Sequence, residues 1–173
     1  MNVSDAIRLK RAVRKFTDQP LPEETILAIL NAGRRAQSSK NTQPWHFIAI
    51  TDKAILKELS EYGEWAGHLA GAALGVAIVH PDPVERFQIL FDIGQAAAYM
   101  QLAAWDMGVG SCMATIYQED KARQTLGFPP EFPPKMTVQP DFLPKMPKSR
   151  IDIVRSNSMA LISSTCMACI MGE

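Results

Sequence analysis

The sequence predicts a single soluble domain in which helices and strands are mixed, for three reasons. The chain has 173 residues, close to the roughly 150 residues of a typical domain. Hydrophobic residues make up 47% and charged residues 21%, so the chain can bury a core and is not intrinsically disordered. Apolar residues recur at helical spacing in some segments and form short β-rich runs in others, so both kinds of element are expected.

Composition also disfavours several classes of protein. Eighteen basic and 18 acidic residues balance, whereas a nucleic-acid-binding surface would make the chain strongly basic. The longest apolar stretch, residues 93–107, is interrupted by polar side chains and is too short to cross a bilayer. The N-terminus is too polar for a signal peptide, and three cysteines fit a reducing compartment. We therefore expect a cytoplasmic protein that binds neither nucleic acid nor membrane.

The N-terminal part of the chain predicts two helices. Ser4 is a candidate N-cap for the first, with Ile7 on its inward side. The second begins after Pro22, whose missing N–H costs nothing in a first turn, and ends near Gly33. Its apolar stripe is formed by Ile26, Ile29 and Leu30.

The next segments predict a loop, two strands and a short helix. Residues 37–42 are polar, and residues 45–50 are rich in β-forming side chains. Asp52 is positioned to cap a short amphipathic helix, and residues 74–79 form a second apolar run. The short helix carries Ile55, Leu56 and Leu59.

Residues 85–107 predict one long helix that ends at Gly108. Its apolar side chains surround the axis, and a small domain cannot cover such a helix on every side. A subunit interface is therefore expected there, and a charge at Ala97 should break it. Residues 109–115 predict a third strand, and residues 119–126 a short helix.

The sequence changes character after Gly127. Seven of the 12 prolines lie between Pro129 and Pro147, and the stretch after residue 155 is rich in small residues. Neither part has a convincing helical or strand period. We therefore divide the chain into a domain of residues 1–130 and an atypical segment, residues 131–173.

Residues 10–15, Lys-Arg-Ala-Val-Arg-Lys, gather four basic side chains at the expected end of the first helix. Cations there complement the negative end of a helix, which is one interpretation. The other is an anion site, because clustered Lys and Arg can donate several charge-assisted hydrogen bonds to one phosphate. The cluster alone does not decide between them.

Two further segments could serve a ligand. Residues 37–45 offer hydroxyl and amide groups to a planar polar ring, although an ordinary turn entering a strand would look the same. Residues 108–112 form a glycine-rich joint that permits close backbone approach or simply ends the helix.

Other local patterns predict no site. Cys166 and Cys169 have CxxC spacing without a second ligand pair, and Cys112 is expected to be buried. The three histidines show no metal-ligand spacing, so no metal is expected. No phosphate-binding glycine motif and no nucleophile elbow occurs in the sequence.

Taken in order, five segments resemble the nitroreductase family of FMN-dependent oxidoreductases. They are residues 10–16, 32–45, 68–72, 92–96 and 108–112, and the most specific combination is the basic segment followed by Asn-Thr-Gln-Pro-Trp at 41–45. The resemblance covers about residues 3 to 130. It implies an α+β fold with a mainly antiparallel sheet flanked by helices, and an intertwined homodimer with FMN at the subunit interface.

The resemblance also implies which residues contact FMN. It assigns Lys10, Arg11 and Arg14 to the phosphate, ribityl chain and pyrimidine edge. Residues of the 37–43 loop would reach the cofactor from the second subunit, and the chain after Gly110 would pass the flavin ring. The full predicted set is Lys10, Arg11, Ala12, Arg14, Gln37, Ser38, Ser39, Asn41, Gln43 and Ser111.

The implied activity is a two-step ping-pong transfer of hydride from NAD(P)H, through FMN, to a small oxidised acceptor such as a nitroaromatic compound or a quinone. No catalytic side chain is expected, because the cofactor performs the chemistry. Arg14 is the candidate for stabilising the reduced flavin. Alternatives are reductive dehalogenation, flavin fragmentation, flavin storage without efficient turnover, or a helical scaffold without a cofactor.

Three features depart from the family pattern. The family commonly has Ser at position 12 and Pro at position 37, where this chain has Ala12 and Gln37. Residues 137–173 lack the expected apolar strand, turn and wrapping arm, so we interpret them as a replaced or frame-shifted segment.

Overall fold

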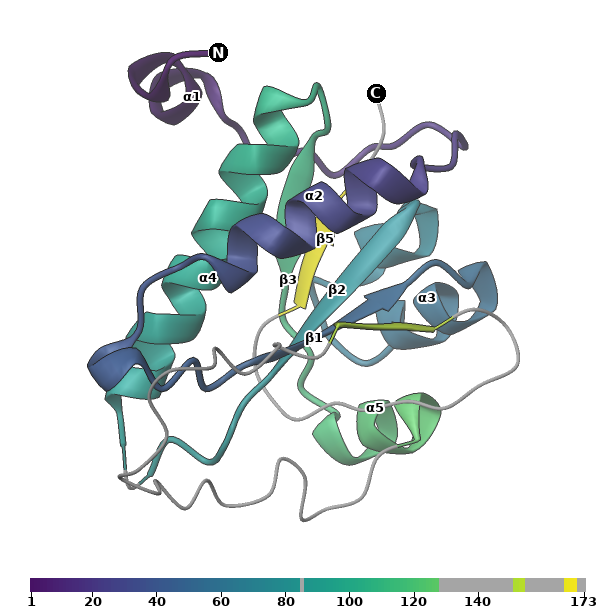
Figure 1. Cartoon of the computed structure of the whole chain (residues 1–173). Coiled ribbons are helices and arrows are strands. Elements are labelled where there is room, and N and C mark those ends of the chain that lie inside the picture. Colours follow the sequence, from purple (N-terminus) through teal and green to yellow (C-terminus); the bar gives the residue numbers. More distant parts are fainter. Residues whose placement is uncertain (85, 128–150, 155–166, 171–173) are drawn as a thin grey trace.

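The computed structural model describes residues 1–84 and 86–127, together with the backbone of residues 151–154 and 167–170. A five-stranded sheet in the order β3-β5-β2-β1-β4 lies between two layers of helices (Figure 1). The strands are β1 (His46–Ile50), β2 (Leu74–Val79), β3 (Ser111–Ala114), β4 (Ile151–Val154) and β5 (Met167–Ile170). The helices are α1 (Val3–Leu9), α2 (Glu23–Arg34), α3 (Lys53–Ser60), α4 (Gln88–Asp106) and α5 (Glu119–Leu126), with short 3₁₀ turns η1 (Ser39–Asn41) and η2 (Gly67–Gly71).

The sheet is mainly antiparallel, which confirms the predicted α+β fold. β2 pairs antiparallel with β1 and with β5, and β5 pairs antiparallel with β3. The pairing of β1 with β4 is parallel. β4 and β5 come from the segment for which the sequence predicted no regular structure.

Alternation along β1 divides the core into two halves. Phe47 and Ala49 face α2 and α4, whereas Ile48 and Ile50 face α3, η2 and α5. All four side chains are at most 1% exposed, because period-2 alternation in a sheet covered on both faces buries every position. Helix α4 and the turn η1, which carries part of the predicted 37–43 loop, belong to the same layer as α2.

The structure confirms the predicted helices, but the N-cap and the buried face of α1 differ from the prediction. Its N-cap is Asn2, whose side chain accepts a hydrogen bond from the Asp5 amide, and not Ser4. Ile7 is 65% exposed, so the predicted inward face is wrong, and Ala6 is buried instead. Asp52 caps α3 as predicted, accepting hydrogen bonds from the amides of the second and third residues after it.

Gly33 lies in the last turn of α2, which ends at Arg34, close to the end that the sequence predicted. A Cβ at this position would lie 2.7 Å from Cγ of Met100 and 3.1 Å from Cζ of Phe47. Gly33 therefore allows α2 to pack closely against α4. Arg35, in right-handed helical conformation, is the C-cap residue.

Helix α4 is apolar on both sides, as predicted, but the two sides differ in what covers them. The inward side packs in this chain's own core and includes Ala97, which is 4% exposed. A charge at Ala97 would therefore disrupt the fold of one chain, and our prediction that it tests an interface is wrong. The uncovered side carries Phe87, Leu90, Phe91, Gly94 and Ala98.

Gly108, at φ 77°, ends the long helix as predicted. The helix begins at Gln88, about three residues after the predicted start, and residue 85 itself lies outside the described residues. Among the helices that the structure describes, none is both long and apolar enough to cross a membrane.

Candidate functional site

The chain after α1 lies against the start of β3, although the two segments are about a hundred positions apart. The amide of Val13 donates to the carbonyl of Ser111 over 3.1 Å, and Ala12 forms a parallel bridge with the same residue. A Cβ on Gly110 would lie 2.8 Å from Cγ2 of Val13. The glycine-rich joint therefore permits this close backbone approach, which positions the basic segment of residues 10–14.

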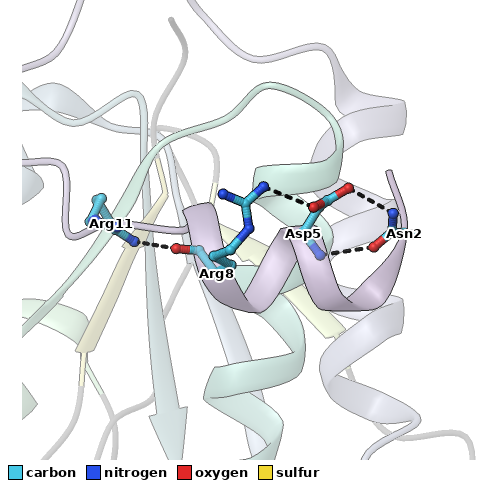
Figure 2. A network of polar contacts seen from close by, with 4 residues as sticks. All are labelled: Asn2, Asp5, Arg8 and Arg11. Carbon is cyan, nitrogen blue, oxygen red and sulfur yellow. Dashed lines mark hydrogen bonds and ion pairs between the residues drawn. The ribbon is translucent and has the colours of Figure 1, made fainter.

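Two of the predicted anion ligands already contact groups of their own chain. Nζ of Lys10 donates to Oε1 of Gln101, on α4, over 3.0 Å. Nη1 of Arg11 donates to the carbonyl of Arg8 over 2.7 Å (Figure 2). It also donates to the carbonyl of Lys10 over 2.9 Å. Arg11 thus satisfies carbonyl groups at the end of α1, which is the capping interpretation of the basic cluster. A guanidinium has five N–H donors, so this contact leaves others for a ligand.

Arg14 is exposed and lies close enough to His68 to influence its titration. Burial lowers the pKa of His68 below its ordinary value of 6.5, and the positive charge of Arg14 lowers it further. Nε2 of His68 is buried and has no hydrogen-bond partner among the described residues. The ring of Phe16 packs edge-on against the imidazole, with 6.2 Å between centroids.

Ser111 is fully buried, and its hydroxyl oxygen has no hydrogen-bond partner within the part of the chain that the structure describes. The hydroxyl group of Ser111 is thus an unsatisfied polar group near the basic segment, whereas the His68 imidazole also has backbone hydrogen bonds at Trp65 and Met113. Sequence reasoning predicted Ser111 but missed the proximity of His68 to Arg14, because only the fold brings these two residues together.

The predicted loop has an unusual backbone. Lys40, Asn41 and Gln43 have φ values of 54°, 53° and 46°, which residues with a side chain rarely adopt. Hydrogen bonds within the loop hold this shape. The Gln43 amide donates to Oγ of Ser38 over 2.9 Å, and Nε2 of Gln43 donates to Oδ1 of Asn41 over 3.0 Å.

The loop is attached to α4 through Asp92. The amide of Ser39 donates to Oδ1 of Asp92 over 3.0 Å. The Asp92 side chain is 2% exposed, and its other oxygen, Oδ2, has no hydrogen-bond partner among the described residues. A cavity of about 340 Å³ opens beside this contact, and it is lined by Gln37, Ser38, Ser39, Gln88, Phe91, Asp92 and Gln95.

The comparison with known families decides the membership of this chain. The model of the family described as "Nitroreductase family" matches residues 7–66 and 60–138 of this chain.

The chain belongs to the nitroreductase family.

Three individual matches illustrate the likeness. A relative from Archaeoglobus fulgidus, provisionally named NADH dehydrogenase/NAD(P)H nitroreductase, is 29% identical over 130 residues, or 71% of this chain and 75% of the relative. The structure of an FMN-dependent nitroreductase from Clostridium difficile R20291 has a TM-score of 0.75, 24% identity, and coverage of 99% of this chain and 87% of that one. A Desulfovibrio desulfuricans structure, described as a nitroreductase in complex with FMN, has a TM-score of 0.72 at 20% identity, covering 99% and 86%.

The predicted site residues of this nitroreductase-family chain form two groups that one chain does not bring together. Lys10 contacts Gln101, and Ser39 contacts Asp92, nine positions earlier on α4. Nine helical residues correspond to about 13.5 Å along the axis and about 180° around it. The basic segment and the loop therefore contact α4 on opposite sides of the helix.

Cys112 is buried in β3 as predicted, and its thiol donates to its neighbour's carbonyl at 3.3 Å. Cys166 lies outside the described residues, and Cys169 contributes only backbone in β5.

Proposed function

We propose that this protein is an FMN-dependent NAD(P)H oxidoreductase that reduces a small oxidised acceptor, such as a nitroaromatic compound or a quinone, by a ping-pong mechanism. Family membership supports the assignment of this protein to the oxidoreductases. The descriptions of two structural neighbours mention FMN, which supports the proposed cofactor. The observation on which the proposal rests is the docking of Ala12 and Val13, in the middle of the basic segment, on Ser111. This docking gathers the predicted phosphate and pyrimidine ligands next to the glycine-rich joint.

The donor set fits FMN. Lys10, Arg11 and Arg14 offer cationic N–H groups, which suit a phosphate and the polar edge of a pyrimidine. Ser111 contributes a buried hydroxyl without a partner among the described residues. When bound, FMN supplies hydride transfer, and the protein supplies binding and orientation. The positively charged guanidinium of Arg14 would stabilise the negative charge of the reduced flavin at its pyrimidine edge.

We further propose that the working unit is a homodimer, with Ser38, Ser39 and Asn41 reaching the cofactor held by the other copy. The uncovered side of α4 supports this, because Phe91 is 68% exposed and Phe87 is 64% exposed in one chain. No atom of the described residues lies within 4 Å of a Cβ built on Gly94, so a second helix has room to approach closely. Exposed apolar patches of this kind mark protein interfaces.

The test is a spectrum followed by an anaerobic titration. The purified chain should be yellow, or become yellow with added FMN, and NADH or NADPH should bleach the flavin absorption. A bound flavin that neither nicotinamide bleaches would contradict the enzyme proposal and indicate a storage protein. A chain that cannot be loaded with FMN would contradict the cofactor proposal.

A further inference from the structure

The loop carrying Ser38, Ser39 and Asn41 adopts a backbone that must be held in place. Three of its residues have left-handed φ values without being glycine, and such conformations persist only where the surroundings stabilise them. Hydrogen bonds inside the loop restrict its shape, but they do not fix its place on the protein. A contact to another element must do that.

Asp92 makes such a contact from the second turn of α4. Its Oδ1 accepts the Ser39 amide over 3.0 Å, across 53 positions of sequence. The acceptor sits on a helix that packs in the core, with neighbours Ile93 and Ala96 buried, so it is rigidly placed. A second hydrogen bond also connects the loop to a neighbouring segment. Nη2 of Arg86 donates to Oγ1 of Thr42 over 3.2 Å, which is longer than the hydrogen bond from Ser39 to Asp92.

The burial of Asp92 is costly and therefore informative. A carboxylate that is 2% exposed loses its hydration, and one of its oxygens has no hydrogen-bond partner among the described residues. Buried polar groups are normally satisfied, and those that are not tend to serve a function. Apolar packing at this position of α4 would stabilise the fold better but could not accept the Ser39 amide.

We propose that Asp92 is a positioning residue for the cofactor site. Its Oδ1 fixes the Ser39 amide, and through it the loop, in the conformation that reaches the cofactor held by the second copy. This inference rests on the proposed function, because the loop has a cofactor to reach only if FMN binds.

The test compares three variants of the full chain, with and without added FMN. D92A removes the acceptor, and D92N keeps an oxygen at the Oδ1 position. Q95A is the matched control, since Gln95 lines the same cavity and the described residues show no bond from it to the loop. Amide hydrogen exchange of residues 37–45 reports the loop, and quenching of flavin fluorescence reports FMN affinity.

We expect exchange at the Ser39 amide to rise at least tenfold in D92A, and FMN affinity to fall at least tenfold. D92N should stay within about threefold of the original chain on both measures, and Q95A should be unchanged. All variants should retain the melting temperature of the FMN-free protein within a few degrees. In D92A the lost hydrogen bond is offset, because a buried carboxylate with one unpaired oxygen is removed and alanine is a good helix former.

The outcomes separate the two proposals. If the original chain does not bind FMN, the proposed function fails, and loop exchange still tests the anchor. If FMN binds and D92A leaves both loop exchange and affinity unchanged, the role of Asp92 is wrong. A D92N variant as impaired as D92A would also overturn it, because charge and not the Oδ1 acceptor would then matter. Loss of affinity in Q95A to the same degree would show a general effect of the cavity and contradict the assignment.

Discussion

Gly110 and Val13 approach so closely that a Cβ on Gly110 would lie 2.8, 2.9 and 3.0 Å from three side-chain atoms of Val13. Val13 is β-branched, so it cannot rotate away easily. We expect Gly110→Ala to lower the free energy of unfolding by about 1–3 kcal/mol. It should also weaken FMN binding, since the basic segment would move away from Ser111. Thermal melting and flavin fluorescence measure the two effects.

Gly67→Ala is the matched control, because a Cβ there meets no atom within 4 Å. This variant should keep both the stability and the FMN affinity of the original chain. Equal losses in the two variants would show that the contact between Gly110 and Val13 does not matter.

Arg14→Ala should weaken FMN retention at least tenfold, because a charge-assisted contact to the cofactor is lost. Lys15→Ala is the control, since Lys15 carries the same charge one position later and is not in the predicted set. Equilibrium dialysis against FMN compares the two. Equal retention by both variants would argue against a specific role of Arg14.

Ala98→Glu should convert the proposed dimer into a folded monomer. Ala98 lies on the uncovered side of α4, so one chain can accommodate glutamate there, whereas a dimer would bury an unpaired carboxylate. Ala97→Glu should instead unfold the chain, because Ala97 is 4% exposed in its own core. Sedimentation and circular dichroism distinguish these results. An Ala98→Glu protein that still sediments as a dimer would show that this face is not the interface.

The pKa of His68 should rise when Arg14 is replaced by alanine, because one of the two causes that lower it is removed. NMR titration of the imidazole measures this change directly. In the original chain the folded pKa lies below the ordinary value of 6.5, so the unfolded state binds more protons between the two values. Stability should therefore fall as the pH drops from about 6.5. His68→Gln should reduce this dependence, and an unchanged pH profile would contradict the role of His68.

Elements specified by local signals could be predicted from sequence. The Asp52 cap, the continuous apolar run of β2 and the acidic first turn of α5 each act within a few residues, and the structure confirms these elements. The cap of α1 was harder to predict, because Asn2 and Ser4 are both good capping residues. Its apolar residues are largely exposed in one chain, so their spacing gave no reliable inward face.

The missed parts of the site depend on contacts between distant segments. The hydrogen bond from Ser39 to Asp92 crosses 53 positions, and the influence of Arg14 on His68 crosses a similar distance. No period or motif spacing encodes such pairs, because packing of α4 and η2 against the sheet creates them. Strand β5 could not be predicted for the same reason, since its place depends on β2 and β3 as neighbours.

The insertion of β5 between β2 and β3 has a consequence for biosynthesis. β3 meets the rest of the sheet through β5, which is made more than fifty residues later. A nascent chain can therefore pair β1 with β2 early, but β3 must wait for Ile170 to leave the ribosome before its ladder is complete. Completion of the strand that contains Ser111 thus depends on a part of the chain that is synthesised more than fifty residues later.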